Sequence, residues 1–127
     1  MLIRMAELLP TGSTLYLEGS STAGVIDEYL RDHPAEHTTE VPRGTIWPRS
    51  TVYHMPMTSE NISGLAALMD TVAEPEVCNH LLAYQGTTAY IIWYDAFYKS
   101  HLYLRKEVPE SEVQRLCADF GTEYSAY

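Results

Sequence analysis

The sequence predicts one α+β domain over residues 1–127, with helices mainly on one face of a mixed sheet of about five strands. Short runs with alternating apolar residues are typical of strands, and longer runs with helical spacing separate them. The expected order along the chain is β-α-β-α-β-β-β-α. Because the chain opens with strand, helix and strand, we expect one right-handed parallel crossover, which makes the sheet mixed.

The stretch Val77–Lys106 is expected to form the heart of this sheet. It holds three apolar, aromatic-rich runs separated by turn-forming residues, which is the pattern of an antiparallel meander. The three predicted strands are Val77–Tyr84, Thr88–Asp95 and His101–Lys106. The first run also fits a short helix, but we favour a strand because Gln85 and Gly86 signal a turn directly after it.

Two more strands and three helices are expected around the meander. The two strands are Thr14–Glu18 and Thr51–Met57. The helices are expected from Ala23 to His33, from Thr58 or Ser59 to Ala73, and from Pro109 to Phe120. Residues 1–10 fit either a short turn of helix or an arm, and residues 34–50 fit a long ordered connection.

The charge and composition exclude several classes of protein. Eight Lys and Arg stand against seventeen Asp and Glu, a net charge of −9, so the basic footprint that nucleic acids or anionic membranes require is missing. The longest apolar stretch is too short for a transmembrane helix, and the first residues do not resemble a signal peptide. We therefore expect a soluble, cytoplasmic protein whose two cysteines, Cys78 and Cys117, stay reduced.

The face of the sheet turned away from the helices is the first candidate for recognition. Alternation directs Leu15, Leu17, Leu102 and Leu104 toward the helices and their strand neighbours away from them. The candidate binding residues are Tyr16, Trp47, Tyr90, Tyr94, Tyr103 and Arg105. Tyrosine offers a large contact area at low entropic cost, and Arg105 suits an anion. The alternative is that these tyrosines merely cover the sheet and hydrogen-bond to water or to each other.

A catalytic site would use Glu18, His54 and Asp95, because a histidine near two carboxylates is suited to general acid–base chemistry. These three residues come from different predicted strands, so their proximity depends on the strand order. The alternative for Asp95, at the end of its strand, is that it caps the following loop.

Metal binding has only weak candidates. His33 and His37 have the spacing of a two-histidine pair on a helix, but Pro34 breaks that helix. Cys78 and His80 would face one side of a strand, without a second pair of ligands. No phosphate-binding glycine loop is present, so we expect no cofactor.

The sequence thus favours a non-enzymatic module that binds a protein partner or itself, a homodimer being the simplest version. The alternative is a small enzyme or ligand-binding protein with a polar pocket near Glu18, His54 and Asp95, lined also by Trp47.

Overall fold

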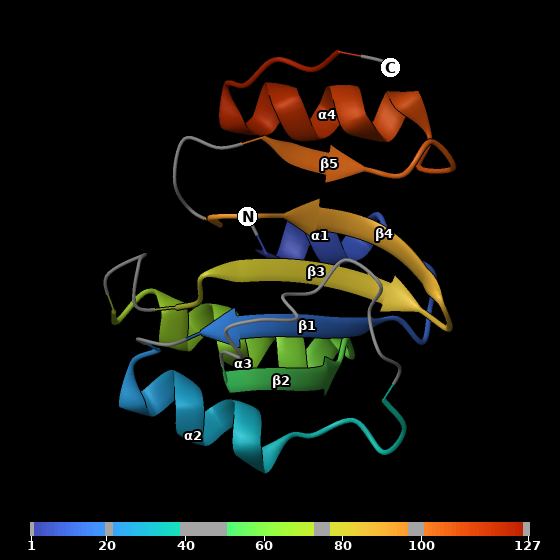
Figure 1. The fold of residues 1–127 in the computed structure, drawn as a ribbon. Coiled ribbons are helices and arrows are strands. Elements are labelled where there is room, and N and C mark those ends of the chain that lie inside the picture. Colours follow the sequence, from blue (N-terminus) through green and yellow to red (C-terminus); the bar gives the residue numbers. More distant parts are fainter. Residues whose placement is uncertain (1, 20–21, 39–50, 73–76, 97–100, 126–127) are drawn as a thin grey trace.

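A five-stranded antiparallel sheet with helices packed on it forms the protein (Figure 1). The computed structural model describes residues 2–19, 22–38, 51–72, 77–96 and 101–125. The elements are α1 (Leu2–Glu7), β1 (Thr14–Gly19), α2 (Gly24–Asp32), β2 (Thr51–Pro56), α3 (Ser59–Met69), β3 (His80–Gln85), β4 (Thr88–Trp93), β5 (Leu102–Leu104) and α4 (Glu110–Phe120). The predicted α+β class and the predicted order of elements are confirmed, and Leu2–Glu7 forms a short helix, α1, rather than an arm.

The strand order across the sheet is β2-β1-β3-β4-β5, and every neighbouring pair is antiparallel. The expected parallel crossover between the first two strands is therefore wrong. A helix that leads straight into the next strand imposes the parallel direction, whereas the long connection after α2 leaves the direction of β2 free. The sheet is consequently antiparallel rather than mixed.

The meander is confirmed, with shorter strands than predicted. The alternative of a helix over Val77–Tyr84 is wrong, since His80–Gln85 pairs with both β1 and β4. The pairing of β3 with β4 shifts by one residue next to Tyr84, which leaves Tyr90 as the extra residue of a β-bulge. The third strand is limited to Leu102–Leu104, because only these residues pair with β4.

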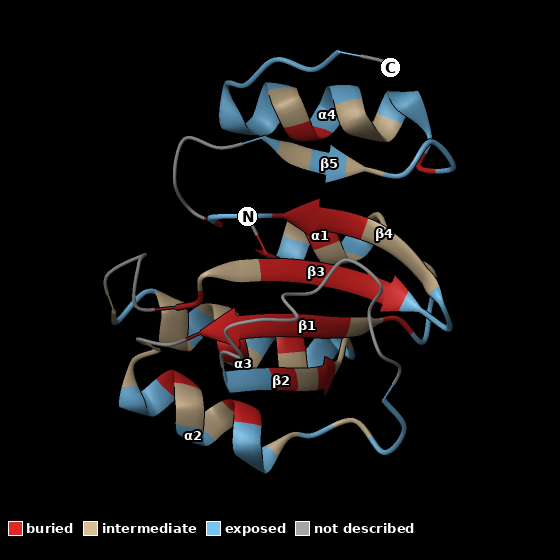
Figure 2. Ribbon diagram, in the orientation of Figure 1, coloured by how far each residue is buried: buried red, intermediate tan, exposed pale blue. Residues whose placement is uncertain are grey.

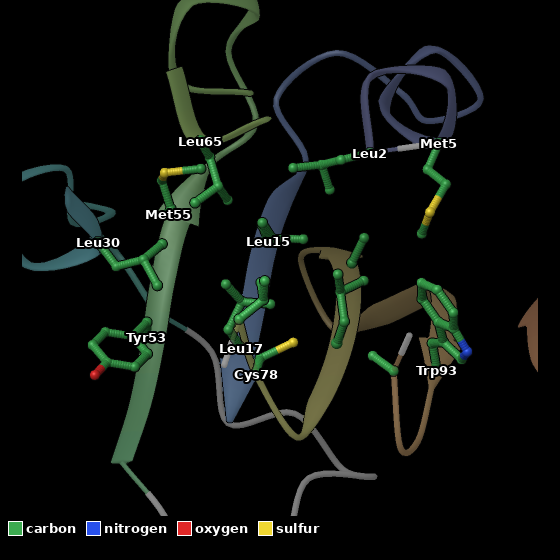
Figure 3. Packing of buried hydrophobic residues seen from close by; sticks show 14 of the residues in the cluster. Leu2, Met5, Leu15, Leu17, Leu30, Tyr53, Met55, Leu65, Cys78 and Trp93 are labelled. Atoms are coloured by element: carbon green, nitrogen blue, oxygen red, sulfur yellow. The ribbon is translucent and has the colours of Figure 1, made fainter. Parts of the chain in front are cut away.

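The main core lies between one face of the sheet and the helices α1, α2 and α3. Cross-strand partners such as Leu15 and Met55, or Leu81 and Trp93, share this first face. Figure 3 shows the side chains of the helices pointing toward those of the strands. The buried residues that α1 to α3 contribute are Leu2, Met5, Ile26, Leu30, Ile62 and Leu65. Burial of this apolar face is the main force that holds the sheet and these helices together.

The opposite face, here called the second face, carries a smaller buried cluster made only of strand residues. That cluster consists of Tyr16, Leu82, Tyr84 and Ile92, with Ala89 packed against it. The predicted alternation is confirmed in that Tyr16 and Glu18 point away from the first-face core. The expectation that both lie on an open surface is wrong, because they are only 5% and 1% exposed (Figure 2 shows β1 almost wholly buried).

Candidate functional site

Four polar side chains meet at the centre of the second face. The Tyr16 hydroxyl donates a hydrogen bond to Glu18 Oε1. The Tyr16 and His54 rings meet edge to face, with centroids 5.2 Å apart. His54 Nδ1 lies 3.0 Å from the Tyr84 hydroxyl oxygen, at hydrogen-bond distance. We call Tyr16, Glu18, His54 and Tyr84 the polar cluster.

The register of three strands brings this cluster together. Tyr16 on β1 lies opposite His54 on β2 and opposite Leu82 on β3. Tyr84 follows Leu82 by two residues, so alternation places it on the same face and next to His54. Glu18 follows Tyr16 by two residues on β1 and shares the second face for the same reason. The antiparallel pairing of β1 and β2, which the sequence did not predict, is therefore what creates the cluster.

Burial sets the protonation of the cluster. It raises the pKa of Tyr16 well above the ordinary value of a phenol, and the hydrogen bond to Glu18 raises that pKa further. Burial also lowers the pKa of His54 below its ordinary value, because the charged imidazolium is disfavoured away from water. At neutral pH the cluster therefore presents a neutral phenol and a neutral imidazole.

The cluster brings together two of the three predicted catalytic residues and leaves the third beside another histidine. Glu18 and His54 both contact Tyr16. Asp95 follows β4, where its backbone N–H donates to His80 Nδ1 at 3.0 Å. His80 is the cross-strand partner of Glu18. Glu18 as a whole residue is only 1% exposed and accepts the Tyr16 hydroxyl, so the described contacts of the cluster are hydrogen bonds within the protein.

Exposed aromatic residues gather on the β4–β5 side of the second face. Tyr103 lies opposite Ile92 and is 52% exposed, and Tyr94 is 36% exposed. The Tyr94 ring meets the His80 ring edge to face, with centroids 5.4 Å apart, and this fixes its side of the sheet. The Tyr103 ring stacks with the His101 ring at a centroid distance of 6.3 Å. We call Tyr94 and Tyr103 the tyrosine surface.

Arg105 and Tyr90, two other predicted binding residues, do not extend this surface. Arg105 forms an ion pair with Glu107, with Nε and Oε2 2.9 Å apart, so its charge is matched within the chain. Tyr90 is half-buried at the bulge, where its carbonyl accepts the Arg105 N–H. Trp47 lies outside the described residues.

The structure separates the predicted metal ligands. Cys78 packs in the first-face core, whereas His80 lies on the second face, because the strand begins only at His80 and its alternation does not reach Cys78. His33 ends α2, where its ring stacks on Tyr29 and its Nδ1 lies 2.8 Å from the Tyr29 carbonyl oxygen. His37 is exposed. Within the described residues, no three His, Cys, Asp or Glu side chains converge on a point suited to a metal.

Tyr84 is the residue of the polar cluster that the sequence analysis missed. Its parity with His80 and Leu82 places it on the second face, but only the strand order brings it beside His54. A second polar contact was missed for the same reason: the Tyr53 hydroxyl on β2 donates to Asp27 on α2. Asp27 also accepts two hydrogen bonds from Arg31 Nε, at 2.9 and 3.0 Å. This second contact ties α2 to the edge of the sheet.

No helix in the described parts of the chain has the length and apolar character needed to cross a membrane. Comparisons with protein-family models, with curated proteins and with solved structures gave no match to this chain.

Proposed function

We propose that this protein is a non-enzymatic interaction module that binds another protein through its tyrosine surface, with a second copy of the chain as the first partner to test. The observation that carries the proposal is the exposure of Tyr103 and Tyr94, two large aromatic side chains on the face that no helix of the main core covers. Tyrosines of this kind are enriched at the centres of protein interfaces.

The state of the sheet edges favours association through the second face over association by strand addition. On the β2 edge, Pro56 has no N–H to offer, and the His54 carbonyl already accepts the N–H of Ala35 at 2.9 Å. On the other edge, α4 follows β5 and runs alongside it (Figure 1). Pro56 and the Ala35 contact thus restrict strand addition along part of the β2 edge, while the tyrosine surface faces solvent.

We also propose that the protein works in the cytoplasm. Both cysteines are free thiols, and Cys78 is buried in the main core. A reducing compartment keeps such thiols unpaired.

Sedimentation velocity over a wide range of protein concentration tests self-association. We expect a monomer–dimer equilibrium that Tyr103→Ser weakens about tenfold, since an aromatic anchor at an interface contributes at least about 1–2 kcal/mol. Val25→Ser is the matched control, because Val25 is also exposed, at 46%, but lies on α2. A strictly monomeric wild type at every concentration contradicts self-association, and equal effects of the two substitutions contradict the choice of surface.

A small enzyme or ligand-binding protein is the second candidate, with its pocket at Glu18, His54 and Asp95. Glu18 accepts the Tyr16 hydroxyl and His54 packs against the Tyr16 ring, and these contacts with one side chain favour this site over other polar positions. A thermal-shift screen of small polar compounds tests this function, since a ligand that binds the folded state raises the melting temperature. A true ligand of the cluster loses its shift in His54→Gln and keeps it in Val25→Ser.

A further inference from the structure

The turn that follows β4 is bonded to the residues at the start of β3. Asp95, in the middle of this turn, has a left-handed backbone, at φ 49°, which a residue with a side chain adopts only at a cost in free energy. The Asp95 N–H donates to His80 Nδ1 at 3.0 Å, and the Ala96 N–H donates to the Asn79 carbonyl at 2.9 Å. The conformation of the turn therefore depends in part on a histidine ring.

His80 differs from His33 and His54 in the role of its Nδ1. A backbone N–H can only donate, so His80 Nδ1 must accept, and the neutral ring carries its proton on Nε2. His33 is the opposite case, because its Nδ1 lies 2.8 Å from the Tyr29 carbonyl oxygen, which can only accept. His54 Nδ1 faces the Tyr84 hydroxyl, which can donate or accept. Protonation therefore preserves the bond of His33, allows that of His54 to reverse, and breaks that of His80.

The titratable side chains next to His80 in the described structure belong to β1 and to the turn after β4. Glu18 is the buried cross-strand partner of His80 on β1, and it accepts the Tyr16 hydroxyl. Asp95 has an exposed side chain, and the Tyr94 ring meets the His80 ring edge to face. A positive charge on the half-buried His80 ring is therefore attracted to neighbouring carboxylates, whereas its bond to the Asp95 N–H is lost.

We propose that His80 is a pH switch for the tyrosine surface. The neutral ring holds Asp95, and with it Tyr94, in place; the protonated ring releases the turn, and Tyr94 leaves its position beside His80. Histidine is the side chain that ordinarily changes its charge between about pH 5 and 8, so mild acidification is the condition that operates such a switch. The switch stands on the contacts of His80, and its effect on partner binding rests on the proposed function.

NMR spectroscopy tests the switch without any partner. At about pH 7.5, nitrogen–proton correlation spectra of the imidazole rings should show His80 with its proton on Nε2 and His33 with its proton on Nδ1. As His80 becomes protonated, the protection factor of the Asp95 amide should fall by about fivefold, the effect of one hydrogen bond, while that of the Leu82 amide in the middle of β3 does not. A neutral His80 protonated on Nδ1, or equal changes at the two amides, overturns the proposal.

Two substitutions of His80 separate the hydrogen bond from the charge. His80→Asn keeps an acceptor oxygen near the place of Nδ1 but does not titrate, so the Asp95 amide should stay protected between about pH 8 and 5.5. His80→Ala removes the acceptor, so this amide should lose its protection at every pH. His33→Gln is the matched control and should keep the pH response of the wild type. A wild-type response in His80→Asn, or its loss in His33→Gln, overturns the proposal.

Asp95→Asn distinguishes the backbone bond from an ion pair. This change keeps the N–H that donates to His80 and removes the carboxylate, and asparagine tolerates the left-handed conformation. We therefore expect the amide of residue 95 to keep its pH response. Loss of the response means that attraction to the Asp95 carboxylate controls the turn, and this outcome refutes the switch.

Sedimentation velocity at two pH values tests the effect on association. Between about pH 7.5 and 5.5, self-association of the wild type should weaken about fivefold more than that of His80→Asn, which retains every other titrating group. Equal changes in the two proteins contradict control of association by His80. A strictly monomeric wild type contradicts self-association through the tyrosine surface, and the Asp95 amide then decides the switch by itself.

Discussion

Replacing Tyr16 by Phe removes the hydroxyl that donates to Glu18 while keeping the ring that packs on His54. Both partners are buried, at 5% and 1% exposure, so water does not easily replace the lost donor. Leaving a buried hydrogen-bond acceptor unsatisfied costs about 1–3 kcal/mol. We therefore expect Tyr16→Phe to lower the free energy of unfolding by about 2 kcal/mol.

Urea unfolding followed by circular dichroism measures this change. With an m value of about 1.5 kcal/mol/M, the midpoint should fall by roughly 1 M urea at an unchanged m value. Tyr103→Phe is the control, because Tyr103 is 52% exposed and such a substitution alters stability by less than about 0.5 kcal/mol.

A double-mutant cycle with Glu18→Gln isolates the pair. The two single changes should be less than additive, with a coupling of about 1 kcal/mol or more. If Tyr16→Phe is as neutral as Tyr103→Phe, the hydroxyl does not stabilise a buried carboxylate, and the structural role assigned to the polar cluster is refuted.

Three further predictions concern pH and packing. The pKa of His54 is lowered in the folded state, so its contribution to stability is present above about pH 6.5 and is lost as the pH falls toward the lowered pKa. His54→Gln should therefore reduce the loss of unfolding free energy between pH 7 and 5.5, by less than about 1 kcal/mol because the group is only half-buried. Identical losses in the wild type and the variant would refute this prediction. Burial raises the pKa of Cys78 to about 12, so the stabilisation that its neutral thiol provides is complete below about pH 9 and declines above that pH by about 1.4 kcal/mol per pH unit. In urea titrations at alkaline pH, the unfolding free energy of Cys78→Ala should therefore fall less steeply with pH than that of the wild type. An unchanged slope would count against this prediction. At Gly64 in α3 a new Cβ would lie 2.2 Å from the Tyr29 hydroxyl oxygen, so Gly64→Ala should destabilise by about 1–2 kcal/mol despite the better helix propensity of alanine. In a Tyr29→Ala background the same change should stabilise by about 1 kcal/mol, and the absence of this reversal would disprove the clash.

Local signals in the sequence were enough to predict most elements. The spacing of Ile62, Leu65 and Leu68 predicted α3, and Thr58 caps that helix as expected, with its hydroxyl accepting the Asn61 N–H at 3.2 Å. Alternation predicted that Leu15 and Leu17 face the core and that Tyr16 and Glu18 do not. These properties depend on residues close together in the chain, which is why periodicity and capping reveal them.

The sequence by itself therefore determined the class, the order of elements and the two faces of β1. The tertiary structure alone decided that β2 runs antiparallel beside β1, and with it that His54 meets Tyr16 and Tyr84. It also decided that Glu18 is buried rather than exposed. Periodicity assigns a side chain to one face of its strand. Which strands lie beside it, and how far it is exposed to solvent, depend on contacts between residues distant in sequence.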